Sequence, residues 1–165
     1  MLAPPGLETR PTADRMKEDL FNILGSLVKG AVFLDLFCGS GAIGIEALSR
    51  GANSAVFVDS SPKAVAATEA NLQKTRLREN ANVLHAPVEQ ALNFDQNFDI
   101  IFADPPYESN ALICLDLESF LTDSGLVVVE CSSTNTPELK NLTIYRQKRY
   151  TQTQFVFYER QVAFK

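Results

Sequence analysis

The sequence has little histidine and cysteine and contains no long apolar run. Its 165 residues include one histidine, His85, and three cysteines, Cys38, Cys114 and Cys131, which lie far apart and form no CxxC pair. This spacing predicts neither a disulfide framework nor a zinc site, and the lone histidine gives no Ser-His-Asp arrangement. No run of eighteen or more apolar residues and no charged-then-apolar leader occurs, so we expect a cytoplasmic protein without a transmembrane helix or secretory signal.

The sequence also lacks the excess of positive charge that is typical of proteins that bind nucleic acid by bulk electrostatics. Its formal net charge is −5, with 15 lysines and arginines against 20 aspartates and glutamates. The basic residues nevertheless gather near the end, where residues 140–165 contain six of them and a single acidic residue. This asymmetry is compatible either with one basic face or with an ordinary solvated hairpin.

The apolar pattern predicts alternating strands and helices. Hydrophobic residues make up 45% of the chain, and its length favours one domain over residues 1–165, with a loose segment at residues 1–9. We expect helices at residues 16–27 (capped by Thr12 or Asp14), 45–50, 62–75, 87–92 and 111–121. We expect strands at residues 31–37, 55–58, 82–85, 98–103, 126–129, 142–150 and 154–158, with a turn at residues 123–125. This alternation predicts an α/β fold whose parallel sheet is covered on both faces.

A glycine-rich turn follows the first expected strand. Residues 39–44 read Gly-Ser-Gly-Ala-Ile-Gly, in a context where glycines let a ligand approach the backbone. The next strand ends on Asp59, twenty residues after Gly39, where a carboxylate can bind ribose hydroxyls. A nicotinamide dinucleotide and S-adenosylmethionine both fit this pattern. Asp35 favours S-adenosylmethionine because its charge would attract the ammonium and sulfonium groups; alternatively, it is a structural acid bonded to backbone amides.

A second motif ends the strand expected at residues 98–103. Asp104, Pro105, Pro106 and Tyr107 follow it directly. The Asp104 carboxylate and the Pro105 carbonyl could accept the two N–H bonds of an exocyclic amine, the prolines stiffen the turn, and Tyr107 offers a flat face for a base. These groups suit methylation of a base amine, although a strand end with a simple turn would look the same. Right-handed crossovers would bring this motif and the glycine turn to one edge of the sheet.

Four motifs in this order resemble one known family. They are residues 10–15 (Arg-Pro-Thr-Ala-Asp-Arg), residues 33–41 (Phe-Leu-Asp-Leu-Phe-Cys-Gly-Ser-Gly) with residues 46–52 (Glu-Ala-Leu-Ser-Arg-Gly-Ala), residues 104–107 (Asp-Pro-Pro-Tyr) and residues 148–153 (Lys-Arg-Tyr-Thr-Gln-Thr). Together they resemble the RsmD-type methyltransferases, which modify the N2 amine of a guanine in 16S rRNA. The resemblance covers nearly the whole chain from Arg10 onward.

The resemblance implies a three-layer, Rossmann-like class I methyltransferase fold. Its seven-stranded, mostly parallel sheet would have the order 3-2-1-4-5-7-6, with the last strand antiparallel. The implied cofactor is S-adenosylmethionine, without a metal, and the implied partner is 16S rRNA, naked or within an assembled or assembling small subunit. We further expect a monomer.

The same resemblance assigns individual residues. Those implied to bind the cofactor are Arg10, Thr12, Asp35, Gly39, Ser40, Gly41, Asp59, Ser60 and Val88, and those implied to bind and orient the guanine are Asp104, Pro105, Pro106 and Tyr107. Ala86 and Pro87 stand where relatives tend to have Gly-Asp, so backbone groups near Val88, or Glu89, would hold the adenine amino group.

Other functions stay open at this point. The methyl acceptor could be adenine N6 or a protein glutamine amide, although aspartate rather than asparagine before Pro-Pro-Tyr favours a base by family habit. A degenerate module that binds a cofactor or a partner without catalysis is a second alternative. A nicotinamide oxidoreductase fits least, because residues 104–107 offer neither a proton donor nor a hydride geometry.

Overall fold

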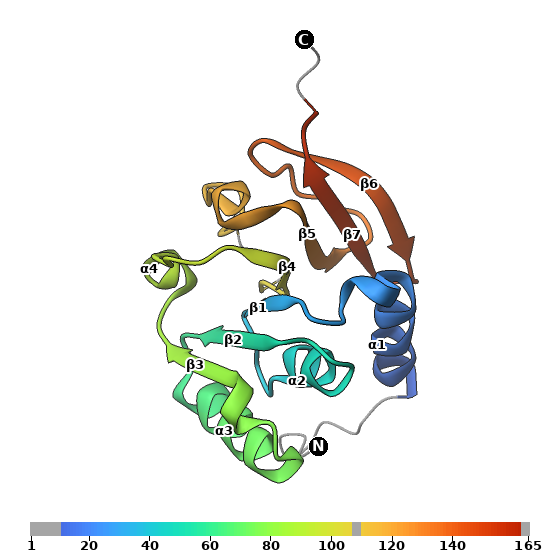
Figure 1. Ribbon diagram of the computed structural model, residues 1–165. Helices are drawn as coiled ribbons and strands as arrows, with labels where there is room; N and C mark the ends of the chain where they lie inside the picture. The colour runs from blue at the N-terminus through green and yellow to red at the C-terminus, as the bar shows by residue number, and fades with distance from the viewer. Residues whose placement is uncertain (1–10, 107–109, 163–165) are drawn as a thin grey trace.

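The computed structural model describes residues 11–106 and 110–162, with side chains from Ala13 onward (Figure 1). In this part of the chain, seven strands form one sheet in the order β3-β2-β1-β4-β5-β7-β6. The strands are β1 (Val32–Leu36), β2 (Ser54–Asp59), β3 (Ala81–His85), β4 (Phe98–Ala103), β5 (Leu121–Ser132), β6 (Leu142–Arg149) and β7 (Thr153–Arg160). Strands β1 to β5 are parallel to one another, whereas β7 is antiparallel to both β5 and β6. The predicted fold class and strand order are therefore confirmed.

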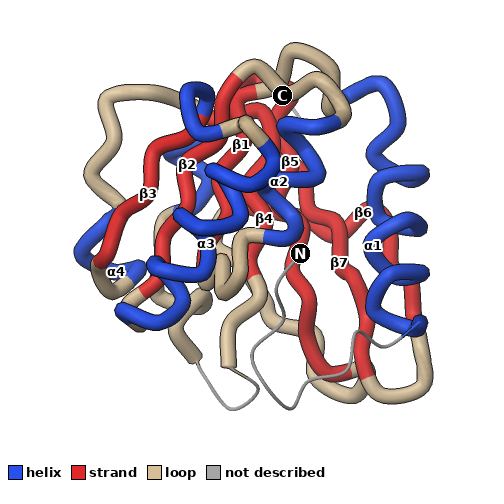
Figure 2. Tube along the Cα trace, turned by 90° about the horizontal axis from the view of Figure 1, so that it is seen from below, coloured by secondary structure: helices blue, strands red, loops and turns tan. Residues whose placement is uncertain are grey.

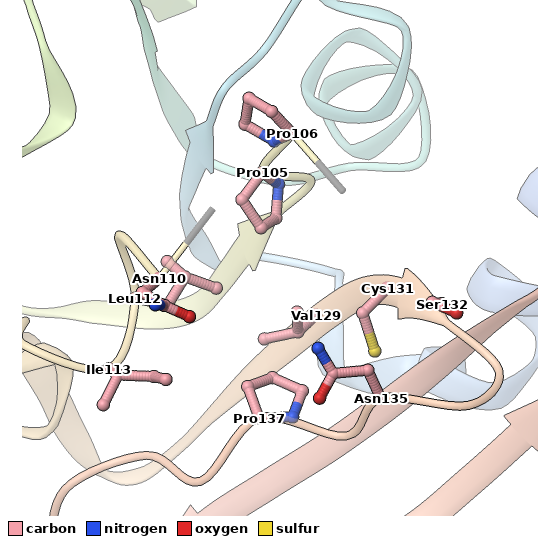
Figure 3. A pocket seen from close by; sticks show the side chains of 10 residues that line it. All are labelled: Pro105, Pro106, Asn110, Leu112, Ile113, Val129, Cys131, Ser132, Asn135 and Pro137. Carbon is pink, nitrogen blue, oxygen red and sulfur yellow. The ribbon is translucent and has the colours of Figure 1, made fainter. Parts of the chain in front are cut away.

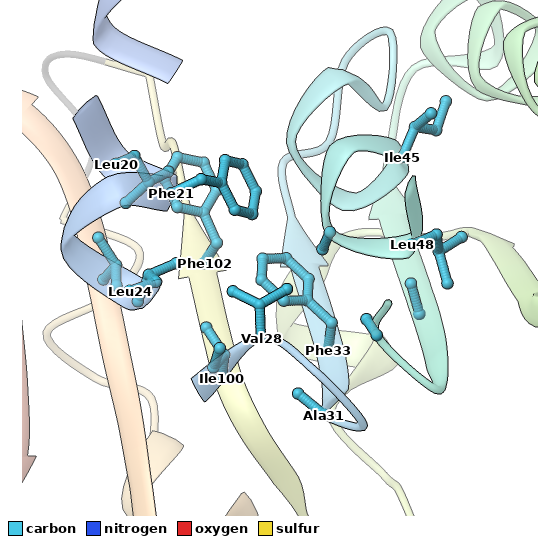
Figure 4. Packing of buried hydrophobic residues seen from close by; sticks show 14 of the residues in the cluster. Leu20, Phe21, Leu24, Val28, Ala31, Phe33, Ile45, Leu48, Ile100 and Phe102 are labelled. Carbon is cyan, nitrogen blue, oxygen red and sulfur yellow. The ribbon is translucent and has the colours of Figure 1, made fainter. Parts of the chain in front are cut away.

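Two apolar cores cover the two faces of the sheet. On one face, which we call the α1 face, phenylalanines such as Phe33, Phe102 and Phe155 pack against α1 (Pro11–Leu24), α2 (Ala42–Ser49) and α3 (Pro62–Thr75). These three helices lie on the same side of the sheet (Figure 2). Figure 4 shows part of the packing between the helices and the sheet. Because strands buried on both faces must be apolar at every position, the central strands read as continuous hydrophobic runs.

The opposite face, which we call the α4 face, has a second core. Leu34, Ile101 and Val127 face this side and pack with Val88 of α4 (Val88–Ala91) and with Leu117 of the 3-10 helix η3 (Leu117–Phe120). Successive side chains along each strand alternate between the two faces. The residue number along a strand therefore tells which face a side chain occupies.

The predicted helix over residues 111–121 is wrong. Residues 111–114 form a turn, and only η3 follows it. The leucines that suggested a helix, Leu112, Leu115, Leu117 and Leu121, are all buried in the second core. An irregular path buries them equally well, and so short a segment gains little from nucleating an α-helix.

The turn predicted at residues 123–125 is also wrong, because β5 begins at Leu121 and runs through it. The strand contains an irregularity there, since Leu121 pairs with Phe98 while Leu126 pairs with Ile100. Gly125 is needed for packing, because a Cβ atom at this position would lie 2.9 Å from the Phe98 carbonyl oxygen.

The first helix begins and ends earlier than its apolar spacing predicts. It starts at Pro11, so Thr12 and Asp14 lie inside its first turn and do not cap it as predicted. Proline suits this first position because its missing N–H would have no partner there. The helix ends at Leu24, where Gly25 has φ +53° and starts the 3-10 helix η1 (Gly25–Leu27). No helix of the described residues has both the length and the apolar character needed to cross a membrane.

Candidate active site

The glycine turn between β1 and α2 has a backbone that favours glycine. Gly39 has φ +57° and Gly41 has φ +80°, both in the left-handed region. A Cβ atom on Gly41 would also lie 2.9 Å from Thr68 Cγ2 of α3. The turn is held from α3 as well, because the Thr68 hydroxyl donates to the Gly39 carbonyl oxygen (2.8 Å) and the Asn71 side-chain amide donates to the Ser40 carbonyl oxygen (3.0 Å).

Gly44 brings α2 into direct contact with the sheet. A Cβ atom at this position would lie 2.4 Å from Phe57 Cε1 and 3.1 Å from Asp35 Oδ2. The absence of a side chain thus lets the helix approach β2 and places the Gly44 N–H against the Asp35 carboxylate.

We expect Gly44→Ala to lower the free energy of unfolding by about 3 kcal/mol, the upper end of the usual cost of overpacking a core. The added methyl group must displace the Phe57 ring, which is fully buried. Urea unfolding measures the effect, and Ser49→Ala, an exposed position on the same helix, is the control. Equal unfolding midpoints for the two variants would contradict the close packing of Gly44.

Asp59 connects the glycine turn to the start of α3. Its Oδ2 atom accepts a hydrogen bond from the Gly39 N–H and its Oδ1 atom accepts one from the Ser61 N–H, each at 2.9 Å. Each carboxylate oxygen has a second lone pair that could accept a ribose hydroxyl. Ser61 caps α3, because its Oγ atom accepts a hydrogen bond from the Ala64 N–H at 3.3 Å.

Asp35 is almost fully buried at 1% exposure on the α1 face of β1. Burial raises the pKa of its carboxyl well above the usual range, the hydrogen bond from the Gly44 N–H lowers it, and the charges of Asp104 and Asp59 raise it further. The Gly44 N–H donates to Asp35 Oδ2 at 3.0 Å, which agrees with the alternative that Asp35 is a structural acid bonded to backbone amides. The three neighbouring carboxylates would also favour a cationic ligand at this edge.

Asp104 and Glu130 form a pair of carboxylates at the carboxyl ends of β4 and β5. Because Ala103 pairs with Val129 in the parallel ladder, the next residues, Asp104 and Glu130, come side by side on the α1 face. Asp104 keeps an exposed surface, yet partial desolvation raises the pKa of its carboxyl to about 6. Desolvation together with the charge of Asp104 raises the pKa of Glu130 to about 8. We call Asp104 and Glu130 the carboxylate pair.

Glu130 was not among the site residues predicted from the sequence. It comes one residue after the predicted end of the fifth strand, and no motif marks it. The only signal is its position after Val129 in a strand next to β4, which requires the strand order to be known.

Glu130 should make the protein less stable at alkaline pH. Its folded pKa of about 8 lies above the ordinary value of 4.5, so the folded state keeps a proton that the unfolded state loses between these pH values. Stability therefore falls as the pH rises through this window. Glu130→Gln removes the effect, and we expect its Tm advantage over the wild type to grow from pH 5 to pH 9. Glu138→Gln, at an exposed position, is the control, and an advantage that is constant with pH would contradict the prediction.

A small cavity of about 70 Å³ lies beside the Asp-Pro-Pro motif (Figure 3). Pro105, Pro106, Val129 and Cys131 are among the residues that line it. Val129 faces the second core, on the α4 face. Since Glu130 faces the other way, the cavity and the carboxylate pair lie on opposite sides of β5.

The remaining predicted site residues are placed less fully. Arg10 and Tyr107 lie outside the described residues, and Thr12 is in the first turn of α1. Ser60 is exposed after β2, with its carbonyl oxygen 3.0 Å from His85 Nε2. Val88 begins α4 and is buried, two residues after Ala86, whose N–H donates to the Asp59 carbonyl oxygen (3.0 Å).

The carboxyl edge of the sheet therefore joins two sets of groups. The glycine turn and Asp59 lie at the ends of β1 and β2, and the carboxylate pair lies at the ends of β4 and β5. Among the described residues, no cluster of histidine, cysteine and acidic side chains could hold a metal ion. Fold and site together define a methyltransferase of the Rossmann-like class.

The chain belongs to the family described as "Conserved hypothetical protein 95", whose model matches residues 1–159. It is 34% identical to the ribosomal RNA small subunit methyltransferase D of Escherichia coli K12, over 95% of this chain and 81% of that protein. This match confirms the predicted resemblance.

Solved structures of two other proteins are similar to this fold. A conserved hypothetical protein of Streptococcus pyogenes is 32% identical with a TM-score of 0.79, and the match covers 88% of this chain and 95% of that chain. The 16S rRNA N2 G1207 methyltransferase of Thermus thermophilus, solved in complex with AdoMet and guanosine, has a TM-score of 0.70 at 23% identity, covering 95% of this chain and 45% of that one. The latter likeness supports the fold alone.

Proposed function

We propose that this protein transfers the methyl group of S-adenosylmethionine to the exocyclic N2 amine of a guanine in 16S rRNA. The observation that carries the proposal is the position of Asp104, at the same sheet edge as the glycine turn and Asp59. The name of the E. coli relative supports small-subunit rRNA as the acceptor. A single domain, a monomeric state and a cytoplasmic location belong to the same proposal.

The residues of the site fit this cofactor. S-adenosylmethionine is a cation at its sulfonium, and the buried carboxylate of Asp35 has Asp59 and Asp104 close enough to raise its pKa. The cofactor would supply an electrophilic methyl group. Asp35 and the turn from Gly39 to Gly41 would hold its methionine end with Arg10 and Thr12 nearby, Asp59 and Ser60 its ribose, and the backbone near Val88 its adenine.

Asp104 and Pro105 would orient the acceptor amine. Above the Asp104 pKa of about 6, the carboxylate is ionised and can accept one N–H of the guanine N2 amine, while the Pro105 carbonyl accepts the other. The amine would take the methyl group from the cofactor's sulfonium, gain positive charge and then release a proton to water. A negative carboxylate held beside this charge stabilises the transition state, and the rest of the rate enhancement would come from positioning. Pro106 would stiffen the turn, and Tyr107 would stack on the base.

The test is transfer of labelled methyl groups to unmodified small ribosomal subunits, to naked 16S rRNA and to bulk protein. Digestion and mass spectrometry then identify the product. Labelled N2-methylguanosine supports the proposal and shows whether the acceptor is RNA or the assembled particle. Labelled N6-methyladenosine or methylglutamine would establish one of the other acceptors, and cofactor binding without transfer to any acceptor would establish a binding module.

A further inference from the structure

β6 is an exposed basic strand at the end of the sheet. Every residue from Thr143 to Arg149 is exposed, and Arg146, Lys148 and Arg149 give the strand three positive charges. In the part of the chain that the structure describes, none of these three cations has a carboxylate oxygen within 4.0 Å. Their charges are therefore available to a partner.

The basic residues of β6 divide between the two faces of the sheet. Arg146 pairs with Phe157 and Lys148 pairs with Phe155, and both phenylalanines belong to the core on the α1 face. Directly paired residues project to the same face, so Arg146 and Lys148 also lie on the α1 face. Arg149 pairs with Gln154 and lies on the opposite face.

Two tyrosines lie among the cations of the α1 face. Tyr145 is 42% exposed and contacts the Phe157 ring edge to face, with centroids 6.0 Å apart. Tyr150 has Lys148 Nζ 5.7 Å from its ring centroid, and its hydroxyl donates to Asp19 Oδ2 of α1 at 2.6 Å. This bond joins α1 to the hairpin, consistent with their places in Figures 1 and 2.

Arg15 extends this group of residues onto the helix. It lies one turn before Asp19, on the same side of α1. We call Arg15, Tyr145, Arg146, Lys148 and Tyr150 the β6 surface. Its three positive charges contrast with the rest of the chain, which has twelve basic and twenty acidic residues.

The register of the sheet connects the β6 surface to the carboxylate pair. Phe155 of β7 pairs with Lys148 on one side and with Glu130 on the other. Lys148, Phe155 and Glu130 thus form one row across the sheet on the α1 face. Asp104 follows β4 directly and extends this row, because Ala103 pairs with Val129. At a strand spacing of about 4.8 Å, Lys148 is roughly 10 Å from Glu130 and roughly 15 Å from Asp104 along this row.

We infer that the β6 surface binds the phosphate backbone of the rRNA next to the target guanine, an inference that rests on the proposed function. Phosphate contacts require lysine and arginine, and exposed aromatic rings among them can stack on neighbouring bases. Basic residues also protect edge strands from pairing with other chains. Protection of the edge strand would work with the charges on either face of the sheet. Binding of the substrate requires them on the α1 face, where the carboxylate pair lies.

The test compares two double variants that remove the same charge. Arg146→Gln with Lys148→Gln changes the β6 surface, and Lys140→Gln with Arg149→Gln changes exposed positions outside it. We expect the first variant to raise the KM for 16S rRNA about tenfold, with the kcat at saturating RNA and the Kd of S-adenosylmethionine unchanged. It should also reduce the salt dependence of RNA binding by a slope of roughly 1.4 to 1.8, since each phosphate contact contributes about 0.7 to 0.9.

The outcomes separate the inference from the proposed function. An equal rise in KM for the Lys140 and Arg149 double variant, or an unchanged KM and salt slope for the Arg146 and Lys148 variant, would overturn the inference. Matching thermal unfolding of the two variants excludes misfolding as the cause of a raised KM. Failure of the wild-type protein to methylate any rRNA would instead refute the proposed function.

Discussion

Replacing Asp104 by alanine is expected to lower kcat for methyl transfer by about 10²- to 10³-fold, the usual effect of removing one group that stabilises transition-state charge. The Asp104 carboxylate lies at the end of β4, beside the edge where the cofactor is proposed to bind. It takes no part in the hydrogen bonds by which Asp59 holds the Gly39 and Ser61 N–H groups. Calorimetric titration should therefore show largely unchanged binding of S-adenosylmethionine. Single-turnover transfer of labelled methyl groups measures the loss.

Asp104→Asn is the matched control for this prediction. The amide oxygen keeps one acceptor for the amine but carries no charge. We expect the wild-type activity to rise with pH as Asp104 ionises near pH 6, and the residual activity of the Asn variant to lose this step. Equal losses of cofactor binding and methyl transfer in the Ala variant would show that Asp104 has a structural role.

Asp59→Ala should have the opposite kinetic pattern, with the main loss in cofactor binding. The substitution removes the acceptors of two backbone N–H groups, Gly39 and Ser61, and the proposed acceptors of the ribose hydroxyls. Hydrogen bonds to charged groups contribute about 1.5 to 3 kcal/mol each, so we expect the Kd of S-adenosylmethionine to rise about 100-fold. Titration of the cofactor measures this change.

Two further measurements make the Asp59 result specific. Asp95→Ala removes an equal charge from an exposed position between α4 and β4, and its Kd should stay close to that of the wild type. At saturating cofactor, the Asp59 variant should recover much of its kcat, which Asp104→Ala cannot do. An unchanged Kd for Asp59→Ala would contradict a role of this carboxylate in binding the cofactor.

Local sequence signals predicted the parallel half of the fold well. Strands β1, β2 and β4 are buried on both faces, so each appears in the sequence as an apolar run. The turn at residues 39–44 needs left-handed backbone at Gly39 and Gly41, which is why glycine marks it in the sequence. The predicted ends of these strands also indicated which residues lie at the carboxyl edge of the sheet.

The errors fall where tertiary packing overrides local preference. The leucines of residues 112–121 fill the second core without an α-helix, and residues 123–125 continue β5 because their neighbours pair with β4. Neither outcome depends on the properties of the segment alone. Both follow from contacts with strands that are distant in the sequence.

The sequence by itself determined the fold class, the glycine turn and the positions of Asp35, Asp59 and Asp104, because each depends on a short segment and on the alternation of strands and helices. Only the tertiary structure decided that Glu130 neighbours Asp104 and that Lys148 shares their row, with Phe155 between. Strand order and register arise from pairing between distant segments. Since the pKa of a carboxyl depends on burial and on nearby charges, the raised pKa values of the carboxylate pair also follow from that pairing.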